Sequence, residues 1–456
     1  MKKVTIIGAG RTGRGTFGEL YFSEGGFDIA FADIDANLVH ALREQGYYVT
    51  KQTNLDTGTF KQIRVDGFEV FDVQADREAY LRRLADSEFV AVAAFPSSFD
   101  AVAQDLADMI RLRIKEGMTH KAAVIIGGNF VGLRSYFEGA LEKLLDADEL
   151  AVLDGQVALI TSKANRKVTF SSDPDAEPLA LEGDDKPILP VEDRFFFEQG
   201  YEYPSFFQRS NDVEQSMAEK IWSENLLHCS LGFMGAYKGC EYLNDAAADE
   251  LCADLAGKAW REGRRALEAE FGIPMPGDTL LETMLGKFSS PYFRDRIERV
   301  VRQPIRKLGK GDRFLGPALL CLKHGIMPFF ILRAAAYGFF VPNAGDEQAA
   351  KIEETLGSMP LEDAVVKITG LDPSVPDEAI ACRLLVGFVQ EIRCLERTKK
   401  LKPADREGTR WGWYLLDTGT MPRALRLPSL CFPAMRKLYR MLISPRSSRR
   451  MSSSPV

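Results

Sequence analysis

The sequence predicts an α/β protein in which an N-terminal doubly wound sheet precedes a mostly α-helical C-terminal domain. Three observations support this prediction. Apolar strand candidates alternate with helix-patterned segments in the first part of the chain, and a glycine-rich turn directly follows the first candidate. Beyond a stretch rich in Asp, Glu and Pro at 171–193, long helical patterns such as 246–271 prevail. We therefore expect domains at 1–195 and 196–400, followed by a tail at 401–456.

Residues 4–7 read as a buried parallel strand that runs into the glycine-rich turn and then into a helix-like stretch. The first glycine permits the tight turn, the second lets backbone N–H groups approach a pyrophosphate, and the third allows the helix to pack closely on the strand. A glycine turn that holds no phosphate is the alternative. The context predicts a Rossmann-type dinucleotide site at Gly8, Gly10, Arg11, Thr12 and Gly13.

A second apolar segment, 27–32, ends at Asp33, which lies 20 positions after Gly13. A carboxylate in this place binds the ribose in such folds. It accepts hydrogen bonds from a free 2′-hydroxyl and repels a 2′-phosphate. The sequence therefore predicts NAD rather than NADP as the cofactor.

Two further strand candidates, 88–95 and 122–126, complete the predicted sheet. Ligands bind outside the carboxyl ends of the strands in a doubly wound sheet. The end of the first candidate therefore places Phe95 and Pro96 beside the cofactor.

In the second part of the chain, an amine, an amide and an imidazole recur at offsets of five and three, as Lys220, Asn225 and His228. At about 100° per residue they fall within one side of a helix, at roughly 0°, 140° and 80°. A base, an oxyanion donor and a positioning group can then meet at one alcohol or carbonyl. The solvated face of an amphipathic helix is the alternative. Since no His, Cys and Asp cluster has zinc-site spacing, we predict hydride transfer without a metal, with a side chain as the base.

An arginine-rich stretch follows at 288–313. Together with the glycine turn and the spacing of Lys220, Asn225 and His228, it makes the chain similar to the polyol-specific long-chain dehydrogenases. The resemblance covers about residues 1–375 and is most specific from 286 to 313. It implies an NAD-dependent oxidoreductase that interconverts a hexitol, or a hexitol phosphate such as mannitol 1-phosphate, with the corresponding ketose, such as fructose 6-phosphate.

The resemblance also implies roles for the site residues. Lys220 takes the carbinol proton as a base and returns it as an acid in ketone reduction, for which its pKa must fall from about 10.4. Asn225 donates its amide N–H to the oxygen that gains negative charge, and Asn129 stands where the family places a second asparagine. His228 binds the neighbouring substrate hydroxyl. For Asn129, an ordinary turn asparagine is the alternative, and for His228 the alternative is a satisfied core or surface histidine.

The arginine-rich stretch also carries cations that suit a substrate phosphate, because guanidinium groups match phosphate oxygens bidentately. These are Arg299, Arg302, Arg306, Lys307 and Arg313. Alternatively, they brace the helical domain by pairing with Asp295, Glu298 and Asp312. The sequence leaves both interpretations open.

One segment departs from the family pattern. Thr161 and Asn165 stand where the family has two acids, while Arg166 is kept. An acid missing near the catalytic amine would alter its proton relay or the hydroxyls it accepts. The identity of the polyol therefore stays open.

Composition predicts an enzyme with two cores rather than a nucleic-acid binder. The 456 residues are 45% hydrophobic and 27% charged, and the net charge is −7. The chain opens on a strand instead of a secretory leader, and Pro and charged residues interrupt the apolar stretch at 314–340, which argues against a transmembrane segment. Seven cysteines without a C-x-x-C pair suit reduced thiols. We expect a cytoplasmic protein that binds a small molecule.

Two other functions remain open. A hydroxyacid dehydrogenase of the Rossmann-plus-helical type also uses a Lys and an Asn, but it usually has a glycine-rich turn before its lysine, which residues 215–219 lack. A catalytically silent NAD-binding regulator would contact a partner or an anionic surface through the basic tail at 401–456. A solvated extension is the simpler interpretation of that tail.

Overall fold

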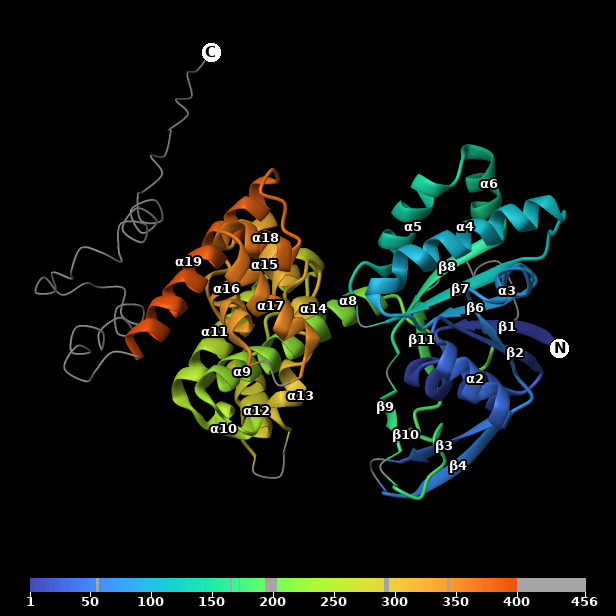
Figure 1. Cartoon of the computed structure of the whole chain (residues 1–456), viewed down its shortest axis with the longest axis horizontal. Coiled ribbons are helices and arrows are strands. Elements are labelled where there is room, and N and C mark those ends of the chain that lie inside the picture. The colour runs from blue at the N-terminus through green and yellow to red at the C-terminus, as the bar shows by residue number, and fades with distance from the viewer. Residues whose placement is uncertain are drawn as a thin grey trace, which may run out of the picture. The chain divides into compact units, whose positions relative to one another are not determined.

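The computed structural model describes residues 1–54, 57–128, 130–164, 166–171, 173–192, 203–290, 295–342 and 345–399. Backbone contacts divide the chain into two compact units, unit 1 from Met1 to Ile221 and unit 2 from Trp222 onward (Figure 1). The domain limit expected near residue 195 and the tail at 401–456 lie outside the described residues. Both therefore stay predictions.

Unit 1 is built on an eight-stranded sheet in the order β12-β11-β8-β7-β6-β1-β2-β5. From β8 to β5 all neighbouring strands are parallel, whereas β11 is antiparallel to β8 and parallel to β12. This confirms the doubly wound sheet. The strands are β1 (Lys2–Ile7), β2 (Phe27–Asp33), β5 (Glu69–Asp72), β6 (Phe89–Val92), β7 (Ala122–Gly127), β8 (Val157–Ser162), β11 (Leu189–Glu192) and β12 (Phe207–Arg209).

The strand order reverses at β1, which lies between β2 and β6. Ile7 at the end of β1 pairs with Ala32 of β2 on one side and with Val92 of β6 on the other. The residues that follow these three strands therefore meet at one edge of the sheet. In sheets of this kind, that edge is where a ligand binds.

Both faces of the central strands are buried, because every residue of β6 and β7 is buried. Parallel sheets of this kind are covered by helices on both sides and read as nearly continuous apolar runs. Figure 1 shows α4, α5 and α6 on one face and α2 on the other. The helices of unit 1 are η1 (Gly13–Gly18), α1 (Glu19–Glu24), α2 (Ala36–Gln45), α3 (Arg77–Ala85), η2 (Pro96–Ser98), α4 (Phe99–Lys115), α5 (Leu133–Leu144), α6 (Ala147–Gln156) and α8 (Val213–Glu219).

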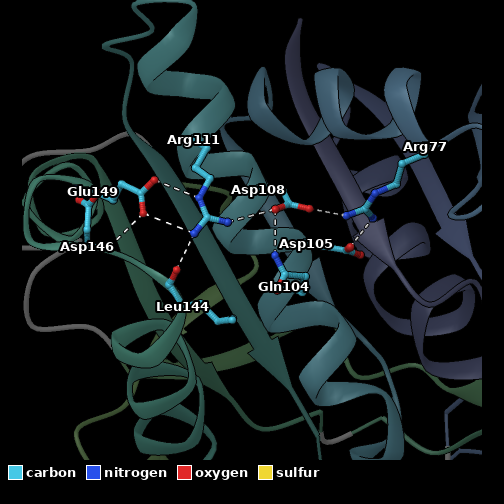
Figure 2. A network of polar contacts seen from close by, with 8 residues as sticks. All are labelled: Arg77, Gln104, Asp105, Asp108, Arg111, Leu144, Asp146 and Glu149. Carbon is cyan, nitrogen blue, oxygen red and sulfur yellow. Dashed lines mark hydrogen bonds and ion pairs between the residues drawn. The ribbon is translucent and has the colours of Figure 1, made fainter.

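A network of arginines and carboxylates joins three of these helices (Figure 2). Arg77 of α3 donates to Asp108 of α4 at 2.7 Å, and Arg111 of α4 donates to Glu149 of α6 at 3.0 Å. Glu149 also accepts from the backbone of Asp146 and thereby completes the capping box of α6. The network fixes the helical layer on one face of the sheet and is remote in sequence from the glycine turn.

A second, four-stranded sheet in the order β4-β3-β10-β9 completes unit 1. The sequence predicts only an interruption at 171–193, yet this stretch supplies β10 and β11. A Cβ atom on Gly15 would lie 2.5 Å from Val168 Cγ1 of β9, so this sheet packs directly on η1. Its strands are β3 (Tyr47–Thr53), β4 (Phe60–Asp66), β9 (Val168–Phe170) and β10 (Leu181–Asp184).

In the described residues of unit 2, helices joined by loops are the regular structure, apart from one isolated bridge between Tyr242 and Arg296. The predicted helix at 246–271 is divided at Asp249, whose side chain accepts from Cys252 N at 3.0 Å and so begins a new helix. Within the described residues, no helix is long and apolar enough to cross a membrane. The helices are α9 (Asn225–Lys238), α10 (Leu243–Ala248), α11 (Glu250–Phe271), α12 (Asp278–Ser289), α13 (Ile297–Val301), α14 (Pro304–Leu308), α15 (Leu315–Lys323), α16 (Phe329–Ala336), η4 (Tyr337–Phe340), α17 (Glu347–Ser358), α18 (Leu361–Thr369) and α19 (Pro376–Lys399), preceded by η3 (Lys220–Glu224) at the boundary of the two units.

Candidate active site

The three glycines of the turn after β1 serve two different purposes. Gly8 has φ of +97°, and a Cβ atom on it would lie 2.8 Å from the carbonyl oxygen of Ala93. A Cβ atom on Gly13 would lie 1.8 Å from the carbonyl oxygen of Gly8. Beside Gly10, by contrast, no described atom lies within 4 Å of such a Cβ. Gly8 and Gly13 therefore allow the turn to close, and Gly10 leaves open room where a ligand can approach the backbone.

The helix after this turn begins at Arg11 and continues without a break through η1 and α1 to Glu24. The first N–H groups of a helix have no partner within it and carry partial positive charge, which suits a pyrophosphate. Arg11 is exposed at this end, and its guanidinium carbon lies 5.4 Å from the centre of the Phe170 ring. Thr12 is the residue before η1.

Ala9 is held from both sides of its backbone. Its N–H donates to Asp33 Oδ2 at 2.6 Å, and its carbonyl oxygen accepts from Arg14 Nε at 2.8 Å. Arg14 also donates to the carbonyl oxygen of Leu179 at 2.7 Å, and burial lowers the pKa of its guanidinium. Asp33 therefore lies at the end of β2, against the turn, in the place expected of the ribose-binding carboxylate.

A buried ion pair stabilises the helix that follows the glycine turn. Arg166 contacts Glu19 and donates to the carbonyl oxygen of Gly15 at 3.2 Å. The sequence signalled Arg166 only as a residue kept from the family pattern, and it gave no sign of Arg14. Both guanidinium groups fix the backbone around the glycine turn.

β6 ends at Val92, three residues before the predicted end of that strand. Phe95 is 67% exposed, and Pro96, which has no N–H to continue the sheet, begins the short helix η2. Both residues follow the strand next to β1, at the predicted ligand edge. Asn129 and Asn165 lie outside the described residues, while Thr161 is buried in β8, where its hydroxyl has no hydrogen-bond partner among the described residues.

Lys220, Asn225 and His228 follow one another along three helical segments joined without a break, α8, η3 and α9. The prediction of a regular α-helix is wrong in one respect, because Lys220–Glu224 forms a π turn. A π turn closes hydrogen bonds from i to i+5, so its angular step is smaller than 100°. The amide of Asn225 therefore lies closer to the side of Lys220 than the expected 140°. All three side chains are partly buried.

Glycines on neighbouring helices accommodate this π turn. A Cβ atom on Gly263 of α11 would lie 2.5 Å from the carbonyl oxygen of Trp222, and one on Gly316 of α15 would lie 2.3 Å from Trp222 Nε1. The indole N–H of Trp222 donates to the carbonyl oxygen of Gly311 at 3.1 Å. The turn is thus fixed by packing that the sequence pattern does not reveal.

His228 contacts the arginine-rich stretch. Its Nε2 atom lies 3.1 Å from Asp295 Oδ2, and Asp295 also accepts from Arg299 Nε at 2.6 Å. Burial acts to lower the pKa of His228, but Asp295 and the neighbouring Cys229 outweigh it, so that the pKa is raised. The two cations hold the pKa of Asp295 well below its usual range against the effect of burial.

Cys229 is a residue with a lowered pKa that sequence analysis missed. Arg313 Nη1 donates to its Sγ atom at 3.2 Å, and the thiol is 1% exposed. Burial alone would raise its pKa, yet Arg313, Lys307 and His228 lower it to about 5. In the sequence, only its place directly after His228 draws attention to it; its contact with the arginine-rich stretch is seen in the structure.

The remaining predicted phosphate ligands are engaged to different extents. Arg306 donates to Asp312 at 3.0 Å. Lys307 donates to the carbonyl oxygen of Val300 at 2.5 Å, and burial lowers the pKa of the Lys307 ammonium group to about 8. Arg302 is 65% exposed and lies 4.0 Å from Glu298. The pairs expected for a bracing role are therefore present, and Arg302 is the member most open to solvent.

Two family models match the chain. One, described as "Mannitol dehydrogenase Rossmann domain", matches residues 2–194, and the other, "Mannitol dehydrogenase C-terminal domain", matches residues 212–377. Curated relatives include a mannitol-1-phosphate 5-dehydrogenase of Thermoanaerobacter pseudethanolicus, 26% identical over 82% of this chain and 94% of the relative. The enzyme of the same name from Phaeosphaeria nodorum is 24% identical over 82% of this chain and 95% of the relative.

Solved structures share the fold. Mannitol 2-dehydrogenase of Pseudomonas fluorescens, in a ternary complex with NAD and D-mannitol, superposes with a TM-score of 0.63 and 14% identity, covering 87% of this chain and 93% of that one. A D-sorbitol dehydrogenase in substrate-free form gives a TM-score of 0.55 at 14% identity, covering 86% and 93% of the two chains.

Proposed function

The chain belongs to the mannitol dehydrogenase family of polyol dehydrogenases, and we propose that it interconverts a hexitol phosphate such as mannitol 1-phosphate with fructose 6-phosphate, using NAD. The observation that carries the proposal is that a family match over both units coincides with Lys220, Asn225 and His228 on one helical run. The similarity to two mannitol-1-phosphate 5-dehydrogenases supports the choice of a phosphorylated substrate.

The residues at the end of β1 fit NAD. The open space beside Gly10 and the first N–H groups of the helix suit the pyrophosphate, with Gly8, Gly13 and Thr12 shaping the turn and Arg11 adding positive charge. Asp33 accepts from the backbone N–H groups of Ala9 and Asp35 and still has lone pairs for ribose hydroxyls, and its charge repels a 2′-phosphate. Phe95 and Pro96 line the same edge. NAD, when bound, supplies the acceptor or donor of the hydride.

Lys220 holds and releases the proton of the reacting hydroxyl. It accepts the carbinol proton in alcohol oxidation and returns it to the carbonyl oxygen in ketone reduction. Asn225 donates its amide N–H to that oxygen as negative charge develops on it, and Asn129 is proposed as the second donor. The π turn that begins at Lys220 favours this role, since such turns are frequent at functional sites.

At the other end of the substrate, His228 binds the hydroxyl next to the reacting carbon. Arg302 is the exposed cation proposed to meet the phosphate, and Arg299, Arg306 and Lys307 add positive charge around it while bonding within unit 2. Arginine forks bind phosphate oxygens in pairs, and several cations in a short span hold a dianion.

A substrate panel tests the proposal. NADH consumption is followed with fructose 6-phosphate, fructose and a set of small ketoacids. We expect the highest kcat/KM with fructose 6-phosphate. Preference for a ketoacid would instead indicate a hydroxyacid dehydrogenase, and NADH binding without turnover on any substrate would indicate a regulator.

A substitution tests the role of Lys220. Lys220→Met should lower turnover by on the order of 10²–10⁴-fold with unchanged NADH affinity. Lys238→Met is the matched control, because Lys238 lies at the end of the same helical run and pairs with Asp249. Near-normal turnover of the Lys220 variant would remove this assignment.

A further inference from the structure

We propose that Asp295 is a positioning residue for substrate binding, which holds the Nε2 edge of His228 so that the Nδ1 edge is the one presented to the substrate hydroxyl. The inference deepens the proposed function and rests on the role given there to His228. Asp295 is 67 positions away from His228 in the sequence. Its part is visible only in the fold.

The contact is well defined. Oδ2 of Asp295 lies 3.1 Å from Nε2 of His228, and the two side chains are 8% and 21% exposed. The second oxygen, Oδ1, accepts from Arg299 Nε at 2.6 Å. The Phe288 ring, whose centre lies 5.4 Å from that of the imidazole, restricts the ring from another side.

The backbone from Asp295 to Ile297 is anchored. The carbonyl oxygen of Asp295 accepts from Leu243 N at 2.8 Å, and Ile297 N donates to the carbonyl oxygen of Glu241 at 3.0 Å. Between these two bonds, Arg296 forms the isolated bridge with Tyr242. The carboxylate therefore projects from a fixed stretch of backbone toward α9.

This arrangement selects the state of the imidazole. A carboxylate has no proton to give, so Nε2 carries the proton that lies between the two groups. A side-chain hydrogen bond with Cys229 also acts on the ring, and Nδ1 is the atom assigned to the substrate. Nδ1 accepts a hydrogen bond when the ring is neutral and donates one when it is protonated. Without Asp295 the ring can turn over or change tautomer, and the substrate hydroxyl no longer meets the same ring nitrogen.

Two groups next to the imidazole raise the pKa of His228, in agreement with the contact to Asp295. Asp295 and Cys229 favour the protonated ring, while Arg299 is bound to Asp295, and Arg313 and Lys307 act on Cys229. Phe288 of α12 adds no charge. The pKa of His228 is raised above its ordinary value although burial opposes this.

His228, Asp295 and Arg299 form a triplet of a histidine, a carboxylate and a cation, and unit 2 contains a second triplet of this kind that serves as a control. Glu270 contacts His324 at 2.6 Å and Lys323 at 2.7 Å, so a carboxylate again bridges a histidine and a cation. Neither histidine nor carboxylate of that second triplet belongs to the candidate site. Glu270→Gln therefore reproduces the chemical change without touching His228.

A double-mutant cycle tests the inference. Asp295→Asn, His228→Ala and the double variant are compared for kcat, for KM with fructose 6-phosphate and for NADH affinity. We expect Asp295→Asn to raise KM roughly tenfold with NADH affinity unchanged, and to add less than about twofold in the His228→Ala background. Glu270→Gln should leave KM unchanged. An equal effect of Asp295→Asn in both backgrounds would overturn the inference.

A spectroscopic measurement separates this inference from the proposed function. The chain has four histidines, so ¹⁵N-histidine labelling gives four pairs of ring signals, and His228→Ala identifies one pair. Asp295→Asn should change the Nδ1 and Nε2 shifts of His228 and leave the other three pairs in place. If the intact enzyme does not reduce fructose 6-phosphate, the proposed function fails while this measurement still stands. Unchanged His228 shifts in a folded Asp295→Asn protein would refute the positioning role.

Discussion

The Nε atom of Arg14 donates to the carbonyl oxygen of Ala9 across 2.8 Å. Ala9 is the second residue of the glycine turn, so a buried guanidinium fixes the backbone that is proposed to meet the pyrophosphate. The same group reaches the carbonyl oxygen of Leu179 at 2.7 Å, two residues before β10. The small sheet thus contributes to the shape of the nucleotide site.

We predict that Arg14→Lys weakens NADH binding by roughly tenfold, because a single ammonium group cannot reproduce two directed bonds of a guanidinium fork. Fluorescence titration with NADH measures the effect. Arg113 provides the control, since it is fully buried and donates to the carbonyl oxygen of Ala85 at 2.7 Å, far in sequence from the turn. Arg113→Lys should lower the melting temperature while the folded protein keeps its NADH affinity. Equal losses of affinity in both variants would show that the effect on binding is not specific to Arg14.

Alanine at two glycines should separate folding from binding. Gly13→Ala places a methyl group 1.8 Å from the carbonyl oxygen of Gly8, so we expect loss of the folded protein or a strongly lowered melting temperature. Gly10→Ala enters open space and should leave the melting temperature nearly unchanged but weaken NADH binding at least tenfold. Normal NADH affinity of Gly10→Ala would mean that no ligand approaches the backbone there.

The arginine-rich stretch should divide into a structural and a binding member. Arg306 is engaged by Asp312 and by Gln303 Oε1, each at 3.0 Å. Arg306→Lys should therefore lower the stability by about 1–2 kcal/mol and leave the ratio of KM values for fructose 6-phosphate and fructose unchanged. Arg302 is 65% exposed, and an ion pair so exposed contributes little to stability.

Arg302→Gln should accordingly raise KM for fructose 6-phosphate selectively, with the melting temperature unchanged. Steady-state kinetics with the two ketoses and thermal unfolding of both variants measure the contrast. If Arg306→Lys raised KM for fructose 6-phosphate but not for fructose, we would conclude that Arg306 binds the substrate phosphate.

The local parts of this fold could be predicted from the sequence. The buried strand before Gly8, the turn and the position of Asp33 follow from apolar runs and glycine spacing, and the structure has β1 and β2 there. β10 and β11 could not be predicted, because they are four-residue strands, too short for a clear pattern, whose stability depends on their partners in the sheets.

The candidate site was predictable as a set of residue types but not as a set of contacts. Offsets of five and three placed Lys220, Asn225 and His228 on a helix, but the π turn depends on how Trp222 fits beside Gly263 and Gly316. The pairing of His228 with Asp295, and the lowering of the Cys229 pKa by Arg313 and Lys307, depend on residues distant in sequence. Periodicity reports which face is buried and carries no information on such partners.

Glu262 is a buried residue of α11 whose carboxylate contacts the first turn of α16. It is 7% exposed and accepts from Phe330 N and Ile331 N, each at 2.9 Å, so it caps a helix in the interior of unit 2. Burial raises its pKa to about 7, although these backbone N–H groups favour the charged form. The folded state therefore binds a proton more tightly than the unfolded chain between about pH 4.5 and pH 7.

Because of this difference, the free energy of unfolding contributed by Glu262 should fall as pH rises through that window, by about 3 kcal/mol, and level off above it. Glu262→Gln cannot titrate, so the stability of the native chain relative to this variant should decrease by that amount from pH 4.5 to pH 8 in denaturant unfolding. Glu270→Gln should show no such decrease between pH 4.5 and pH 8, because Lys323 and His324 lower the pKa of Glu270, whose contribution is lost only as pH falls below about 4.5. A relative stability of the Glu262→Gln protein that does not vary with pH would mean that the carboxylate is charged, and compensated, throughout this range.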